Sequence, residues 1–176
     1  MRSKILNLLI LVSVLFSLSA CLKKGKDDPL ISLRTRKARI VGKWKLVSGV
    51  KTITSFPSFK STTEYTNKKY TQSYSGSAQI DSGDVIYTIE FEKNGNVKEY
   101  RQLEYSDRHG IVGTWNFTGG IGDKKNKEEI VLHDPRVNFP SDIVYTIKEL
   151  RNKKLVLARG FLHNANGFSE EFTFEQ

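Results

Sequence analysis

The sequence predicts an all-β fold: a single antiparallel up-and-down β-barrel of eight or nine strands, with at most one short N-terminal helix. Three observations lead to this prediction. From Ile40 onward, apolar residues recur at every second position, which is the period of a half-buried strand. Turn-forming residues interrupt that pattern at roughly 8 to 12 positions, as in small all-β domains. Consecutive strands leave exposed sheet edges, and closure into a barrel removes them.

Length and composition are those of one globular domain. The chain has 176 residues, of which 38% are hydrophobic and 11% aromatic, too many core-forming residues for a disordered tail. A formal net charge of +9 comes from 28 basic and 19 acidic side chains. One cysteine excludes both a disulfide framework and a zinc site built from several thiolates.

Eight segments have the alternation or composition of strands. The first begins at Ile40 and places Trp44 and Lys45 on opposite faces. The second, residues 85–91, is followed by Asn94-Gly95, a strong hairpin signal. The others are expected at residues 97–105, 111–117, 128–133, 143–149, 154–161 and 168–175.

Two further segments are less regular. Ser55 to Gly76 is rich in Ser, Thr, Tyr and Lys, and we expect one or two exposed strands or a long flap there. Residues 32–39 are the one stretch that could form a helix, short and basic.

The last hairpin allows a prediction of register. If Phe161 pairs with Phe168, then Arg159 lies opposite Glu170, and apolar partners match farther along: Leu157 with Phe172, and Leu155 with Phe174. Arg159 and Glu170 then face inward, where a charge pair is costly unless it is satisfied, so we expect them at a wet mouth of the barrel. The pair either anchors a polar ligand head group or closes the barrel end as an ion pair, and we favour the ion pair.

The N-terminus predicts export. Arg2 and Lys4 precede an apolar run, residues 5–20, that would span about 24 Å as a helix, short of the roughly 30 Å hydrocarbon core. Residues 1–20 therefore have the pattern of a secretory signal peptide. Removing them leaves 26 basic and 19 acidic side chains, or +7.

Leu18-Ser19-Ala20-Cys21 resembles the lipobox of bacterial lipoproteins. The resemblance implies that the signal is cut before Cys21, that this cysteine is diacylated, and that its new amine is usually acylated too. Two or more acyl chains give stable membrane anchoring. Residues 21–30 would be a charged, flexible tether, and residues 31–176 the barrel domain. Lys26-Asp27-Asp28 is similar to signals that send lipoproteins of Bacteroidetes-type bacteria to the cell surface, so we expect the outer membrane, on its periplasmic or its external face.

Gly42-Lys43-Trp44 resembles the Gly-x-Trp signature of the calycin barrels, the lipocalins and fatty-acid-binding proteins, in which the tryptophan plugs one barrel end. The same pattern recurs at Gly113-Thr114-Trp115. With the strand-like segments 130–132, 145–147 and 155–157, the domain looks like the lipocalin-like domain of small Bacteroidetes-type lipoproteins. It lacks the disulfide of many secreted lipocalins and the C-terminal Arg-x-Tyr of the fatty-acid-binding proteins. The resemblance therefore supports the fold better than it supports the binding of a fatty ligand.

No catalytic signature occurs: there is no Gly-rich phosphate loop, His-Glu-x-x-His, Cys-x-x-Cys or Gly-x-Ser-x-Gly. His133-Asp134 lacks a third metal ligand. We expect neither enzyme activity nor a cofactor or metal. The basic and aromatic stretch from Lys60 to Tyr74 has the composition of a single-strand binder. Because export makes nucleic acid an unsuitable partner, we interpret most lysines as solvating the outer wall.

The sequence thus predicts a lipid-anchored, non-catalytic envelope protein that binds a small apolar or amphipathic ligand inside the barrel. Residues expected to line or floor the interior are Trp44, Tyr87, Phe91, Trp115, Leu157 and Phe172, with Arg159 and Glu170 near the mouth. The alternative is a filled barrel without ligand that serves as an envelope protein–protein interaction module. In that case the tyrosines between Ser55 and Gly76 would form the contact surface.

Overall fold

A computed structural model describes residues 35–55, 57–103, 110–119, 128–135, 142–163 and 166–176. The expected signal peptide, Cys21 and the tether lie outside the described residues. The elements in chain order are α2 (Arg36–Ile40), β1 (Gly42–Ser55), β2 (Phe59–Thr66), β3 (Lys69–Tyr74), β4 (Ile80–Phe91), β5 (Asn96–Leu103), β6 (Val112–Thr118), β7 (Glu129–His133), β8 (Ile143–Leu150), β9 (Lys154–His163) and β10 (Asn166–Glu175).

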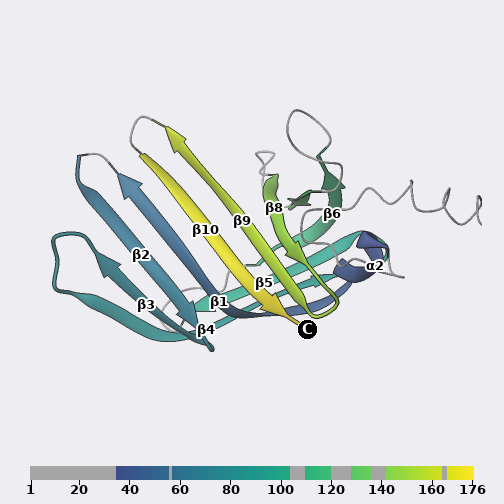
Figure 1. Ribbon diagram of the computed structural model, residues 1–176, viewed down its shortest axis with the longest axis horizontal. Helices are drawn as coiled ribbons and strands as arrows, with labels where there is room; N and C mark the ends of the chain where they lie inside the picture. Colours follow the sequence, from purple (N-terminus) through teal and green to yellow (C-terminus); the bar gives the residue numbers. More distant parts are fainter. Residues whose placement is uncertain (1–34, 56, 104–109, 120–127, 136–141, 164–165) are drawn as a thin grey trace, which may run out of the picture.

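All ten strands belong to one antiparallel sheet, in the order β1-β10-β9-β8-β7-β6-β5-β4-β3-β2, and β2 pairs with β1 again to close the ring (Figure 1). Within the described residues, the prediction of an all-β, antiparallel, single-sheet fold with at most one short helix is confirmed. The predicted number of eight or nine strands is wrong. None of the helical structure in the described ranges is long and apolar enough to cross a membrane.

The additional strand comes from the segment between Ser55 and Gly76, which forms the regular hairpin β2–β3 and not a flap. Asn67 and Lys68, with φ of 48° and 68°, make its two-residue turn with positive φ at both positions, as a type I′ hairpin requires. Two of its tyrosines, Tyr65 and Tyr70, face inward and are buried. They do not form the exposed contact surface expected from the sequence.

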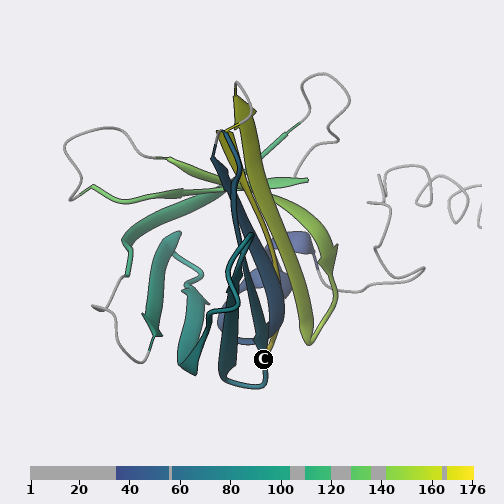
Figure 2. The same ribbon diagram turned by 90° about the vertical axis from the view of Figure 1, so that its left-hand side faces the viewer.

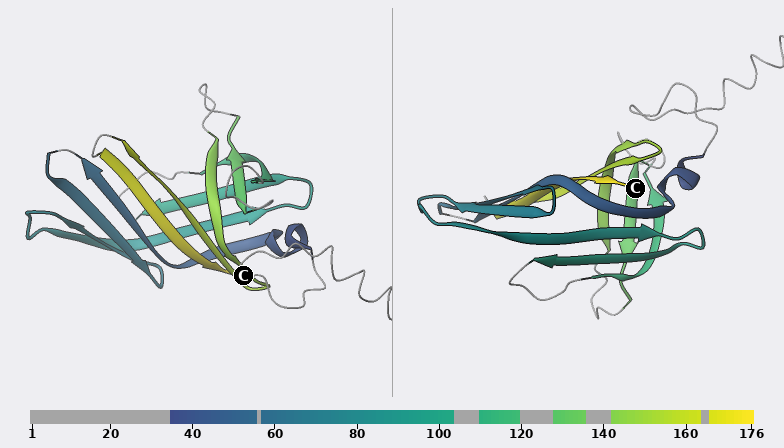
Figure 3. Two further views of the ribbon diagram at one scale, coloured as in Figure 1. Left: turned by 45° about the horizontal axis from the view of Figure 1, so that its top comes forward. Right: turned by 90° about the horizontal axis from the view of Figure 1, so that it is seen from below.

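The barrel has a narrow end and a wide end. At the narrow end, residues 42–45 of β1 pair directly with residues 88–91 of β4, so eight strands surround the interior. Farther along, the β2–β3 hairpin is inserted between β1 and β4, which raises the number to ten. Because barrel diameter grows with strand number, the interior widens toward the β2–β3 side. In Figure 3, right, β1, β2 and β10 form one wall and β4 and β5 the other, with β6 to β8 across one end.

Among the described residues, strand pairing is incomplete on one side of the wide end. The β8–β9 ladder ends at the pair Thr146–Ala158, and the β5–β6 ladder at Lys98–Val112. Within the described ranges, the outer parts of β9 and β5 therefore continue beyond their neighbours. Figure 2 shows β9 and β10 extending past the shorter strands.

The narrow end is closed by the first Gly-x-Trp segment. Trp44 is fully buried, and its indole N–H donates to the backbone carbonyl of Ile40 at 2.7 Å, tying β1 to α2. Thr35 caps that helix by accepting from the backbone N–H of Ala38. Gly42 has φ of 140°, a conformation that favours glycine.

Candidate functional site

The ladder register arranges the inner face of β3, β2, β1, β10 and β9 in three rows, because alternate residues of each strand point inward and cross-strand partners align. The rim row, nearest the wide end, is Tyr74, Ser61, Ile53, Phe168 and Phe161. The polar belt is Gln72, Thr63, Lys51, Glu170 and Arg159, continued onto β4 by Asp81. The floor row is Tyr70, Tyr65, Gly49, Phe172 and Leu157.

The interior below the polar belt is filled by side chains. Tyr87 packs edge-on against Phe172 and Phe174, with ring centroids 5.3 and 5.1 Å apart. Gly49 lies directly against the Phe172 ring, where any Cβ would collide with it. The six apolar residues expected to line a ligand cavity are all buried in this packed core: Trp44, Tyr87, Phe91, Trp115, Leu157 and Phe172. None of them borders the cavity described next.

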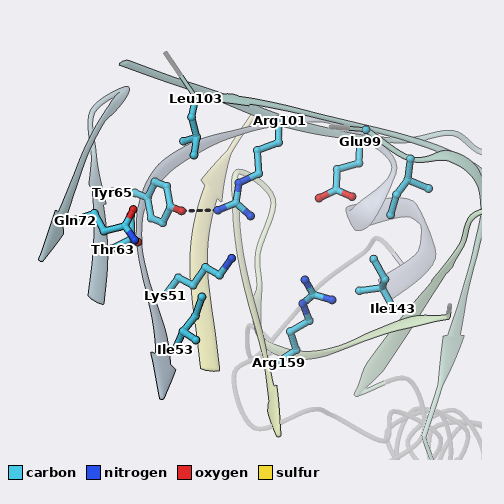
Figure 4. Close-up of a pocket in the computed structure, with 12 residues that line it drawn as sticks. Lys51, Ile53, Thr63, Tyr65, Gln72, Glu99, Arg101, Leu103, Ile143 and Arg159 are labelled. Carbon is cyan, nitrogen blue, oxygen red and sulfur yellow. Dashed lines mark hydrogen bonds between the residues drawn. The ribbon is translucent and has the colours of Figure 1, made fainter. Parts of the chain in front are cut away.

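A cavity of about 490 Å³ lies above the floor, at the level of the polar belt (Figure 4). Its apolar walls include Ile53, Leu103, Ile111 and Ile143. Its polar walls are Lys51 from β1, Thr63 and Tyr65 from β2, Gln72 from β3, Glu99 and Arg101 from β5, and Arg159 from β9. Of the eight residues expected to line the interior, Arg159 alone is among these.

Arg159 and Glu170 form the ion pair that the register predicted. They are ladder partners, and Arg159 Nε donates to Glu170 Oε1. The Glu170 side chain is 1% exposed and that of Arg159 28%, so the carboxylate is buried while the guanidinium reaches the cavity. Tyr145 donates a second hydrogen bond to Glu170 Oε1 at 3.3 Å, whereas Oε2 is buried without a partner. Burial raises the pKa of the Tyr145 hydroxyl, which keeps it a donor.

Arg101 lies on the opposite wall and is held by aromatic rings. Its guanidinium donates to the Tyr65 hydroxyl and lies 5.1 to 5.4 Å from the centroids of the Tyr65, Tyr87 and Phe172 rings. Neighbouring Glu99 accepts a hydrogen bond from the Tyr87 hydroxyl at 2.7 Å. Burial is the main cause that raises the pKa of the Glu99 carboxyl above its ordinary 4.5.

Lys51 is half-buried, and the structure gives its ammonium group no hydrogen bond or ion pair with any described residue. Burial lowers the pKa of Lys51 below its ordinary 10.5, and the positive charges of Arg101 and Arg159 lower it further. The negative charge of Glu170, the ladder partner of Lys51, raises the pKa of Lys51 and so opposes these effects. The cavity thus concentrates positive charge that its own carboxylates do not fully balance.

The sequence did not identify Lys51, Glu99 or Arg101 as site residues. Val97, Glu99 and Arg101 are alternate residues of β5 and therefore face the interior together. This spacing is the sequence feature that could have identified Glu99 and Arg101. For Lys51 no such signal existed, because the ladder shifts by one residue between Leu46 and Ser48.

No cluster of metal ligands is found in the described part of the chain: no three His, Cys, Asp or Glu side chains gather there. His133 Nδ1 lies 2.8 Å from Asp142 Oδ1 at the surface. Comparison with protein-family models, with curated proteins and with solved structures finds no match to this chain. The lipocalin-like resemblance therefore stays a prediction.

Proposed function

We propose that this protein is a non-catalytic binding protein that holds a small amphipathic molecule in the cavity at the wide end of its barrel. The observation that carries the proposal is the cavity itself, about 490 Å³ with apolar walls and a few polar groups. Small-molecule sites in proteins have this composition and typically measure about 300 to 1,000 Å³.

The proposal includes a lipocalin-like barrel anchored in the bacterial outer membrane through acylated Cys21. A closed antiparallel ring with a buried Gly-x-Trp tryptophan at one end supports the first part. The lipobox-like Leu18-Ser19-Ala20-Cys21 supports the second. Replacing Cys21 with Ser should release the protein from membranes into the soluble fraction, and continued tight membrane association would contradict the anchor.

Binding is favoured over the protein-interaction module by the distribution of packing. A module without ligand calls for a filled interior throughout, whereas only the narrow half is filled here. The module retains one supporting observation, the exposed apolar side chain of Leu162 on β9, which alternates with the inward-facing Phe161.

A titration with phenylnaphthylamine, a neutral apolar dye that fluoresces in dry pockets, tests the proposal. We expect saturable binding to the full chain bearing Cys21→Ser. Ile143→Trp should abolish it by filling the cavity, since Ile143 lines the wall. Val144→Trp is the matched control, because Val144 is the next residue of β8 and points to solvent. No saturable binding, or equal binding by both variants, would overturn the proposal.

A further inference from the structure

We propose that the bound molecule has a monoanionic head group and a single apolar chain, and that it binds head-first, with the anion between Lys51 and Arg101 and the chain running out along the rim row. This inference rests on the proposed function and adds to it the charge and orientation of the ligand.

The charge follows from the groups that face the cavity. Among the described residues, Lys51, Arg101 and Arg159 line it, together with one carboxylate, that of Glu99. Glu170 lies beside the cavity without lining it, and it forms an ion pair with Arg159. Three cations against two carboxylates leave a surplus of one positive charge, and one monoanion balances it. Asp81, at the far end of the belt, does not line the cavity and already accepts from the Tyr74 hydroxyl at 2.8 Å.

The position of the anion follows from which cations lack a carboxylate partner. Among the described residues, Arg159 pairs with Glu170, whereas Arg101 donates to the neutral Tyr65 hydroxyl and lies over three rings without an ion pair, and Lys51 has no hydrogen-bond partner. Figure 4 shows the ends of Lys51 and Arg101 converging on the cavity from opposite walls, β1 and β5. An anion between them would accept charge-assisted hydrogen bonds from both, in a setting where burial strengthens them.

The orientation follows from where empty space lies. Below the belt, Phe172 and Leu157 are fully buried in the packed core, and Tyr65 forms the lower wall of the cavity, so an apolar chain has no room beneath the charged groups. Above the belt, the rim row presents Ile53 and the edge-on Phe161–Phe168 pair, whose ring centroids are 5.0 Å apart. Phe161 is 61% exposed, and a ligand chain lying along the rim row would cover it.

Displacement of phenylnaphthylamine by three ten-carbon amphiphiles tests the charge: decanoate, decanol and decyltrimethylammonium. The protein is the full chain bearing Cys21→Ser. We expect decanoate to displace the dye at concentrations at least tenfold below those of the other two. Lys51→Met should remove most of this preference, whereas Lys60→Met, an exposed lysine of β2, should keep it. Equal displacement by decanoate and decanol would overturn the inference and leave the proposed function standing. Absence of any dye binding would instead overturn the proposed function.

Two additions secure the test. Arg101→Lys serves as a second variant, which keeps the charge but loses the planar donor, and we expect a partial loss of the decanoate preference. Thermal denaturation shows whether each variant is folded. If Lys51→Met is unfolded, Lys51→Gln takes its place. Decanoate with a diazirine at its tail should crosslink to rim-row residues such as Ile53 and Phe161. Crosslinks confined to floor-row residues would contradict the head-first orientation.

Discussion

The buried ion pair between Arg159 and Glu170 gives a prediction whose size can be worked out. Arg159→Met removes the guanidinium and leaves the Glu170 carboxylate, 1% exposed, with only a 3.3 Å hydrogen bond from Tyr145. At an effective dielectric constant of about 20, two unit charges 4 Å apart attract by about 4 kcal/mol. Breaking a buried pair by removing one partner typically costs about 3 to 5 kcal/mol. Because Arg159 is itself 28% exposed, we expect the lower end, about 3 kcal/mol.

The second arm of the experiment removes both charges. Replacing a buried pair by apolar residues of similar volume is often neutral, so Arg159→Met combined with Glu170→Leu should recover most of the lost stability. Urea denaturation followed by the fluorescence of Trp44 and Trp115, both in the core, measures each variant. A single variant that loses less than about 1 kcal/mol, or a double variant no more stable than the single one, would show that the ion pair does not stabilise the fold in this way.

Three further predictions concern the interior. Trp44→Ala should lower the free energy of unfolding by about 3 to 5 kcal/mol in urea denaturation, because it empties the fully buried site beside Ile40; a loss under 1 kcal/mol would argue against its role as the plug. Gly49→Val should unfold or severely destabilise the protein, seen as a lower melting temperature, since its side chain would displace the Phe172 ring; an unchanged melting temperature would show that the floor is not packed. Glu99→Gln should stabilise the protein at neutral pH. Because burial raises the folded-state pKa of Glu99, the native protein loses stability as pH rises from 4.5 through that pKa, and the glutamine variant should lack this loss when melting is followed against pH.

The last hairpin was predictable from sequence alone. Its strands β9 and β10 alternate cleanly, so matching apolar partners fixed the register, and the observed pairs Phe161–Phe168, Arg159–Glu170 and Leu157–Phe172 are those predicted. A one-residue slip would have moved every large apolar side chain of one strand to the outer face. Strong alternation on both strands is therefore what makes a register readable.

The first strand shows why the rest was not predictable. Continuing the alternation from Trp44 and Leu46 places Val50 on the inner face, but the register shift before Ser48 reverses the phase, as a β-bulge does. Val50 is 45% exposed as a result, and Lys51 faces the cavity. No composition signal marks that shift, so the sequence did not identify Lys51, the cation central to the proposed site.

The sequence did not clearly predict both strands of the β2–β3 hairpin, for a related reason. Its inward residues include Ser61 and Thr63, which are small, polar and buried, so the apolar period that marks other strands is absent. Gln72 donates to the Ser61 hydroxyl at 2.7 Å, which satisfies one of these groups inside the barrel. Hydrophobic periodicity cannot reveal strands whose inward residues are buried polar side chains such as these.

The central claim is that the cavity holds a ligand, and native mass spectrometry of the Cys21→Ser protein purified from its own host tests it most directly. We expect a bound mass that is lost on denaturation, absent from Ile143→Trp and retained by Val144→Trp. Protein of bare mass in every form, even after incubation with lipid extract from the same host, would contradict the account and favour the interaction module.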